Sequence, residues 1–198
     1  MPTLSASLVL ASSSPRRREI LATLGLHFLI EASGVPELRA PGEAALAYAQ
    51  RLAAAKALDV AARFADGTVV LGADTVVVVD GDVLEKAPDA EAAAAMIARL
   101  AGRAHEVVTA MALVRRPAGV IAEVQITTRV TFRALDAAAI ARYVATGDGD
   151  GKAGAYAVQG VGSGLVTRIE GSYSNVVGLP AAELLDLLSD AGVLTEWP

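Results

Sequence analysis

The stretch that decides the fold is Leu8-Val9-Leu10-Ala11-Ser12-Ser13-Ser14-Pro15-Arg16-Arg17-Arg18-Glu19-Ile20-Leu21. Its apolar start, residues 8–11, predicts a short buried strand. A serine followed by a proline is typical of a helix start, so we expect Ser14 as the N-cap and Pro15 at the first helical position. A strand, a hydroxyl-rich turn and a helix in direct succession indicate an α/β fold.

The rest of the chain continues this alternation and then adds hairpins. We expect further strands at 28–31, 68–71, 75–79, 105–114, 120–132 and 165–169. We expect further helices at about 43–63, 89–100, 136–146 and 181–190. Gly72-Ala73-Asp74 is expected to interrupt a strand, and Asp80-Gly81 predicts a hairpin turn. The fold class is therefore α/β, with a mixed β-sheet flanked by helices, because hairpins in the middle argue against a purely parallel sheet.

Composition limits the partners and the chemistry. A chain of 198 residues fits a single domain over 1–198, with two lobes around a central cleft as one form of it. The formal charge of −5 disfavours binding of long nucleic acid, although a pocket needs only local positive charge to bind a small anion. The absence of cysteine excludes disulfides, thiolate catalysis and cysteine-based zinc sites, and it is compatible with a cytoplasmic location, which we expect. No signal peptide and no run of about 18 apolar residues is present, so we expect no membrane partner.

The turn Ser12-Ser13-Ser14 with Arg16 and Arg17 is the first candidate for chemistry. A helix start presents free backbone N–H groups and the positive end of the helix dipole, which suits a phosphate. Arginines in a first turn oppose that dipole, and a bound anion would offset the cost. An ordinary capped helix with solvated arginines is the other interpretation, and the motif alone leaves both open.

Asp74 and two lysines are the second candidates. A carboxylate beside small residues at the end of an apolar strand suits a metal ligand or a base, but it also suits a turn residue that caps the local backbone. Lys56, in an Ala-rich helix, and Lys86, after the hairpin, are solvated charges by default. They become functional only if folding brings them to the same cleft as the two arginines and Asp74.

The glycine-rich segment 147–164 fails three familiar motifs. A P-loop needs four residues between its first glycine and Gly-Lys, but three separate Gly147 from Gly151. The hexapeptide 149–154 fits G-x-G-x-x-G but follows a predicted helix rather than a strand. An EF-hand loop would need an acid or amide at Lys152. A flexible loop and a substrate-covering loop remain as the interpretations.

The two histidines, His27 and His105, lie in or beside apolar runs, and we expect structural roles for both. The chain has no H-E-x-x-H and no G-x-S-x-G, so neither a zinc hydrolase nor an α/β-type serine hydrolase is supported.

Four long segments in order resemble the Maf family of nucleoside triphosphate pyrophosphatases. They are Leu10-Ala11-Ser12-Ser13-Ser14-Pro15-Arg16-Arg17, Gly72-Ala73-Asp74-Thr75-Val76-Val77, Gly151-Lys152-Ala153-Gly154-Ala155-Tyr156-Ala157-Val158-Gln159-Gly160 and Gly171-Ser172-Tyr173-Ser174-Asn175-Val176-Val177-Gly178-Leu179-Pro180. The resemblance runs from about residue 8 to residue 185. It implies one α/β domain with two lobes around a cleft, often a homodimer, and hydrolysis of a nucleoside triphosphate at the α-phosphorus.

The resemblance also implies the roles of individual residues. Asp74 would be the proton acceptor, and a divalent cation, Mg²⁺ or Mn²⁺, would be held by Asp74 or Glu37. The residues expected around the nucleotide are Ser12, Arg16, Arg17, Glu37, Lys56, Thr75, Lys86 and Gln159. Two departures stand out: Lys86 is followed by Ala87-Pro88 where the family usually has Lys-Pro, and Glu37 lies in a variable loop.

Three positions indicate the substrate. One branch of the family resembles dTTP and UTP hydrolases, and the other resembles 7-methyl-GTP hydrolases with an aromatic residue, a glutamine and a glutamate at these positions. This chain has Arg16, Thr75 and Gln159, so it resembles the pyrimidine branch. The Gln159 amide can donate to a uracil carbonyl and accept from its N3–H, whereas a glutamate could only accept. A nucleotide-binding regulator of cell division, with incidental hydrolysis, is the alternative that these residues leave open.

Overall fold

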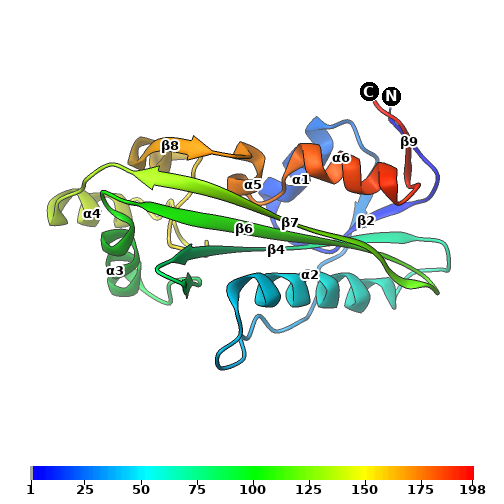
Figure 1. Ribbon diagram of the computed structural model, residues 1–198, viewed down its shortest axis with the longest axis horizontal. Helices are drawn as coiled ribbons and strands as arrows, with labels where there is room; N and C mark the ends of the chain where they lie inside the picture. Colours follow the sequence, from blue (N-terminus) through cyan, green and yellow to red (C-terminus); the bar gives the residue numbers. More distant parts are fainter. Residues whose placement is uncertain (1) are drawn as a thin grey trace.

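A seven-stranded mixed sheet forms the centre of the computed structural model, which describes residues 2–198 (Figure 1). The strand order is β3-β2-β4-β6-β7-β8, and β5 pairs with β4 off this path. The strands are β2 (Leu8–Leu10), β3 (Phe28–Ile30), β4 (Val69–Val79), β5 (Asp82–Leu84), β6 (Ala104–Arg115), β7 (Gly119–Phe132) and β8 (Val166–Glu170). β2 is parallel to β3 and β4, and the remaining pairs are antiparallel, so the predicted mixed sheet is confirmed.

Helices cover both faces of this sheet (Figure 1). The helices are α1 (Pro15–Thr23), α2 (Ala45–Ala61), α3 (Ala90–Leu100), α4 (Ala137–Val144), α5 (Tyr173–Val177) and α6 (Ala181–Asp190), with a 3₁₀ turn η1 (Gly160–Leu165). α2 lies under one face, while α1, α5 and α6 lie over the other. α3 and α4 lie together near one end of the long strands. No helix within residues 2–198 has the length and apolar character needed to cross a membrane.

Local sequence signals are confirmed where they set element ends. Pro15 is the first helical residue of α1 and Ser14 its N-cap, although the Ser14 side chain makes no capping hydrogen bond. Asp80 and Gly81 both have positive φ, 55° and 81°, as a tight hairpin turn between β4 and β5 requires. Asp89 and Asp136 accept hydrogen bonds from Ala92 N and Ala139 N and so cap α3 and α4.

The sequence did not predict four short elements; η1 lies in the segment expected to be a loop, and the other three lie elsewhere. β1 (Thr3–Leu4) pairs with β9 (Leu194–Glu196) at the two ends of the chain, which Figure 1 shows side by side. α5 is the third, and its five residues are too few to show a helical period. β1, β9 and α5 each depend on partners that are distant in sequence, so no local sequence pattern predicts them.

The predicted break in the strand at Gly72-Ala73-Asp74 is wrong. β4 runs without interruption from Val69 to Val79, because it pairs with β6 from Val69↔Arg115 to Val78↔Glu106. Gly72 serves a close contact instead of a turn. A Cβ at this position would lie 2.1 Å from Ala53 O of α2, so only glycine lets the helix approach the strand this closely.

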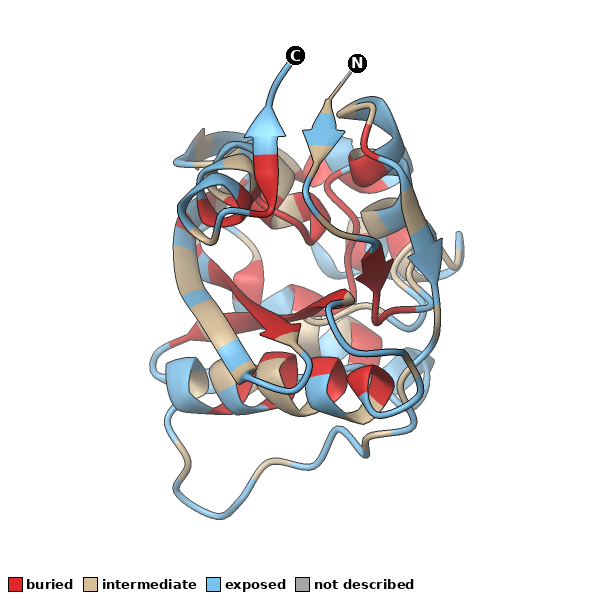
Figure 2. Ribbon diagram, turned by 90° about the vertical axis from the view of Figure 1, so that its right-hand side faces the viewer, coloured by how far each residue is buried: buried red, intermediate tan, exposed pale blue. Residues whose placement is uncertain are grey.

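The apolar core divides along the sheet on the face that α1, α5 and α6 cover. One cluster, around Leu10, Leu71 and Leu184, lies at the β2 end. Another, around Val77, Phe132 and Ile97, lies at the α3 and α4 end. Figure 2 shows the buried residues gathered between the helices and the sheet. β4 and β6 run through both clusters.

One edge of β4 has a gap between two short partners. β2 pairs with Val69–Leu71, and β5 pairs with Val77–Val79, so the residues between Leu71 and Val77 have no strand partner on that edge within residues 2–198. Side chains alternate along a strand, so Asp74 points toward α2 and Thr75 toward α1 and α5. The gap therefore lets one ligand reach side chains on both faces of the sheet.

Candidate active site

A cavity of about 600 Å³ lies at the gap in the edge of β4. This volume is within the range that small-molecule sites occupy, about 300–1,000 Å³. Among the residues predicted to surround a nucleotide, the cavity is lined by Ser12, Arg16, Arg17, Glu37, Lys56, Asp74, Thr75 and Lys86. Folding thus brings the cations and the single strand aspartate to one hollow, which was the geometric condition of the sequence hypothesis.

Lys56 holds two carboxylates at one end of the cavity. Its Nζ donates to Asp74 Oδ1 at 2.6 Å and to Glu37 Oε1 at 2.7 Å. Lys86 Nζ donates to the second oxygen of Glu37. Lys56 and Asp74 are only 7% and 6% exposed, so the default of a solvated lysine is wrong for Lys56. The side chain of Lys86 is 56% exposed, so the expectation of a solvated lysine holds in part for Lys86.

The two carboxylates respond to this environment in opposite directions. Burial raises the pKa of Asp74, and the opposing charges of Lys56 and Arg17 do not cancel that effect. Burial also acts to raise the pKa of Glu37, but hydrogen bonds and charge from Lys56 and Lys86 outweigh it and lower the pKa to about 2. Glu37 is therefore a fixed anion at neutral pH, while Asp74 is the more basic of the two.

Ser12 organises the other end of the cavity. Its Oγ accepts from Ser14 N at 3.2 Å and from Arg17 Nη1 at 3.3 Å. A hydroxyl accepts at its two lone pairs and donates once, so the Ser12 proton has no protein acceptor within residues 2–198. This O–H can donate to a ligand oxygen beside the start of α1.

The carboxyl end of α5 holds both arginines. Arg16 Nε donates to Val177 O at 3.2 Å, and Arg17 Nε donates to Gly178 O at 2.8 Å. Carbonyls at a helix end lack intrahelical partners and carry partial negative charge. They offset the cost of placing two arginines at the start of α1, although neither arginine forms an ion pair within residues 2–198. Burial lowers the pKa of each, but a guanidinium remains charged at neutral pH.

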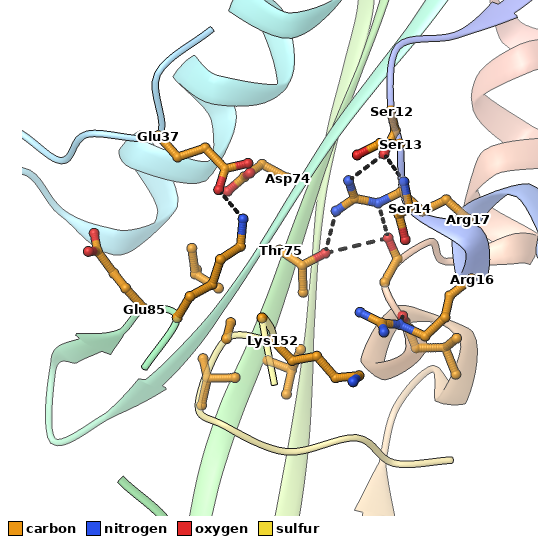
Figure 3. Close-up of a pocket in the computed structure, with 18 of the residues that line it drawn as sticks. Ser12, Ser13, Ser14, Arg16, Arg17, Glu37, Asp74, Thr75, Glu85 and Lys152 are labelled. Carbon is orange, nitrogen blue, oxygen red and sulfur yellow. Dashed lines mark hydrogen bonds and ion pairs between the residues drawn. The ribbon is translucent and has the colours of Figure 1, made fainter. Parts of the chain in front are cut away.

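The carboxylates and the arginines of the cavity lie at opposite ends (Figure 3), and two lysines pair with the carboxylates. Glu37, Asp74 and Glu85 lie at one end, and Arg16 and Arg17 lie at the other beside the serine turn. Arg17 Nη2 also donates to Thr75 Oγ1 at 3.0 Å, which fixes the guanidinium plane against β4. An anion is favoured at the arginine end, and a cation or a polar water at the carboxylate end.

The carboxylate end suits a hard divalent cation. Glu37 and Asp74 both point an oxygen at a single cation position, which the Lys56 ammonium takes. No cluster of three or more His, Cys, Asp or Glu that could hold a metal occurs within residues 2–198. Mg²⁺ commonly takes only one or two carboxylates, with substrate phosphates and water as its other ligands. Three of the four oxygens of Glu37 and Asp74 already accept from lysine ammonium groups, so Mg²⁺ or Mn²⁺ at this end would take most of its ligands from substrate phosphates and water.

Gln159 is the one predicted site residue that does not line the cavity. It is exposed, at the start of η1. Lys152 does line the cavity, and its Nζ donates only to backbone carbonyls, Asp148 O at 2.5 Å and Asp150 O at 3.4 Å. Lys152 was not among the predicted site residues, although it is the only cation in segment 147–164. Tyr48 of α2 was also missed, because an aromatic residue at helical spacing indicates core packing.

His105 has the predicted structural setting. It is 3% exposed, and its Nε2 hydrogen-bonds Tyr156 Oη at 2.8 Å beside Phe132. Burial lowers its pKa to about 4, so the ring is neutral at physiological pH. His27 is exposed, and nothing in the structure assigns it a role.

Comparison with known proteins gives the family. The family model described as Maf-like protein matches residues 7–191. The chain belongs to the Maf-like protein family. Two Maf-like relatives named dTTP/UTP pyrophosphatase, from Shigella dysenteriae and Myxococcus xanthus, are 48% and 49% identical over 96% of this chain and 95% of their own.

A solved structure shows a weaker likeness. It is a nucleoside-triphosphatase, also titled dITP/XTP pyrophosphatase, from Mycobacterium abscessus, with a TM-score of 0.42 and 22% identity. The match covers 64% of this chain and 74% of that one. This likeness is too low to bear on function.

Proposed function

We propose that this chain hydrolyses dTTP and UTP to the nucleoside monophosphate and pyrophosphate. The observation that carries the proposal is the separation of charge in one cavity, with a buried aspartate at one end and two guanidinium groups at the other. A triphosphate is long enough to span the cavity, with anionic phosphate oxygens at the arginine end and the reacting phosphorus near the aspartate at the other end. The pyrimidine relatives at 48–49% identity support the choice of substrate.

The serine turn and the arginines bind the phosphates in this proposal. Ser12 contributes its unused O–H, and the backbone at the start of α1 contributes N–H groups. Arg17 has five N–H donors, of which Gly178, Ser12 and Thr75 occupy three. The remaining two can bind phosphate oxygens, and Arg16 adds positive charge for the departing pyrophosphate, while Lys86 stays with Glu37 at the carboxylate end. Lys152 is a further cation that this proposal places on the phosphates.

Asp74 acts as the general base. Lys56 fixes Asp74 Oδ1, and Oδ2 accepts no hydrogen bond from residues 2–198. Water attacks the α-phosphorus, its proton passes to Asp74, and the bond to the β-phosphate oxygen breaks to release pyrophosphate. The raised pKa of Asp74 suits this role, because a base is most effective when its pKa approaches the working pH.

Glu37 and Asp74 would hold the divalent cation together with the substrate phosphates. When bound, Mg²⁺ or Mn²⁺ would neutralise phosphate charge and lower the pKa of a coordinated water. Lys56, which joins both carboxylates, keeps them close together before the nucleotide arrives.

Of the three residues that distinguish the pyrimidine branch, Arg16, Thr75 and Gln159, this proposal gives recognition of the base to Gln159, because Arg16 faces the phosphates and the Thr75 hydroxyl is bonded within the protein. Because Gln159 is exposed and outside the lining, its side chain or its segment must turn toward the cavity to pair with uracil or thymine. Its amide then offers one donor and one acceptor to that edge of the base.

The test is a pyrophosphate-release assay on a panel of canonical and modified nucleoside triphosphates, each with Mg²⁺, Mn²⁺ or EDTA. We expect release from dTTP and UTP with metal, little from purine triphosphates, and none with EDTA. Arg17→Ala is expected to weaken nucleotide binding and turnover together. Release of orthophosphate and a nucleoside diphosphate, or no reaction with any triphosphate, would refute the proposal.

A further inference from the structure

A chain of hydrogen bonds runs from Arg17 through the sheet to α5. Arg17 Nη2 donates to Thr75 Oγ1 at 3.0 Å, and Thr75 Oγ1 lies 2.9 Å from Thr109 Oγ1. Thr109 Oγ1 donates to Asn175 O at 3.2 Å. Thr75 of β4 and Thr109 of β6 are direct cross-strand partners, and Thr109 is fully buried. No motif in the sequence singled out Thr109.

Proton counting sets the direction of this chain. A guanidinium can only donate, and a backbone carbonyl can only accept. Each threonine hydroxyl has one proton, so when Thr109 gives its proton to Asn175 O, Thr75 gives its own either to Thr109 or to Gly178 O. The other acceptor near Thr75 is Gly178 O, at a longer 3.4 Å. In either case the protein consumes the Thr75 proton, and none remains for a substrate.

The far end of the chain is rigid. Asn175 is fully buried, and its Nδ2 shares two protons among three acceptors at 2.8–3.1 Å, Val107 O, Ile126 O and Thr128 Oγ1. This amide fastens α5 to β6 and β7. The same short helix supplies Gly178 O to Arg17 Nε, so Arg17 is fixed twice by α5, once directly and once through the threonines.

We propose that Thr109 is a positioning residue for the phosphate-binding Arg17, and that Thr75 acts by passing this orientation on and not by donating to the nucleotide. The proposal rests on the proposed function only for the identity of the ligand, a polyphosphate. Hydrogen bonds in series strengthen one another in a buried setting, so loss of one hydroxyl loosens the guanidinium at the other end. The two free N–H groups of Arg17 then no longer point steadily toward the phosphates.

The test measures binding of inorganic tripolyphosphate by calorimetry, alongside kcat and KM for dTTP. Thr109→Val keeps the shape of the side chain and removes the hydroxyl, and Thr109→Ser keeps the hydroxyl. We expect Thr109→Val to weaken tripolyphosphate binding about five- to tenfold, as the loss of about one hydrogen bond implies, and Thr109→Ser to stay within about twofold. Thr75→Val breaks the chain at its other threonine, and the double variant should be no weaker than Thr75→Val alone.

Two controls separate positioning from general destabilisation. Tyr143→Phe removes a different buried hydroxyl, which accepts from Ala157 N and makes no hydrogen bond with Arg17 or α5 within residues 2–198. It should lower stability without changing tripolyphosphate affinity. In an Arg17→Ala background, Thr109→Val should have no further effect on affinity.

Wild-type affinity in Thr109→Val, or equal losses in Tyr143→Phe, would overturn the proposal. So would a full additional loss in the Arg17→Ala background. Because tripolyphosphate is not a nucleotide and need not be hydrolysed, this result stands apart from the pyrophosphate-release assay. Failure of that assay with a positive result here would retain the role of Thr109 and reject only the enzymatic function.

Discussion

Replacement of Lys56 by methionine should destabilise the protein in a way that depends on pH. Lys56 is the direct partner of the buried Asp74 and shares Glu37 with Lys86. Removing one member of a buried ion pair costs about 3–5 kcal/mol, because the other charge stays buried without compensation. Glu37 is partly exposed and keeps Lys86, so only Asp74 is stranded, and we expect the low end, about 3 kcal/mol at pH 8. For a chain of this length that is a fall of about 6–12 °C in Tm.

The sign of the pH dependence follows from Asp74. Its pKa is already raised in the folded protein, and loss of Lys56 raises it further. Between the two folded-state pKa values, Asp74 is protonated in the variant and ionised in the wild type, so the stability deficit grows as pH rises. It grows by about 1.4 kcal/mol per pH unit across that interval. At pH 5 the deficit should therefore be smaller than at pH 8.

Urea unfolding of both proteins at pH 5 and pH 8 measures this directly. Lys86→Met is the matched control, because its more exposed pair with Glu37 should be worth at most about 1 kcal/mol. Adding Asp74→Asn to Lys56→Met should restore stability, since no buried charge remains. A deficit that is the same at both pH values, or equal in Lys56→Met and Lys86→Met, would refute this reasoning.

Four further outcomes are expected. Asp74→Asn should abolish turnover of dTTP while nucleotide affinity stays near the wild-type value, and normal turnover in the variant would show that Asp74 is not the base. In the wild type, kcat/KM should fall as pH drops through a pKa above the usual range for aspartate. Gln159→Glu should reduce use of dTTP and UTP, and an unchanged substrate profile would exclude base recognition by this side chain. Lys152→Ala should raise KM for dTTP more than it lowers Tm, because its ammonium has only carbonyl partners; an unaltered KM would place it outside the phosphate site. Gly72→Ala should lower the free energy of unfolding by about 3 kcal/mol, because its Cβ would lie 2.1 Å from the backbone of α2. Gly34→Ala is the control and should be nearly neutral, because no atom lies within 4 Å of a Cβ there. Equal effects of the two substitutions would contradict the close contact.

Local chemistry in the sequence predicted the ends of elements well. Pro15 begins α1, Asp80-Gly81 makes the hairpin turn, and the last helix matches its predicted bounds, Ala181–Asp190. These features depend on capping, backbone φ and helical period, which neighbouring residues determine. The mixed sheet followed from the order of strands and hairpins.

Features that depend on distant partners could not be predicted in this way. In the local sequence Gly72 indicates a turn, but pairing with β6 and close contact with α2 make it a strand residue. A lysine in an Ala-rich helix gives no sign that it will be buried between two carboxylates, as Lys56 is. α5 has no periodic pattern, although its carbonyls position both arginines. Resemblance to the family supplied the site residues, and the fold supplied the reasons for their arrangement.

The position of bond cleavage is the most direct test of the account, because the cavity must place the α-phosphorus beside Asp74 and the departing pyrophosphate beside the cations. Hydrolysis of dTTP in water enriched in the heavy oxygen isotope, followed by mass spectrometry of the products, reports this position. The account predicts the label in the nucleoside monophosphate and none in pyrophosphate. Label in pyrophosphate, or in orthophosphate released with a nucleoside diphosphate, would contradict it.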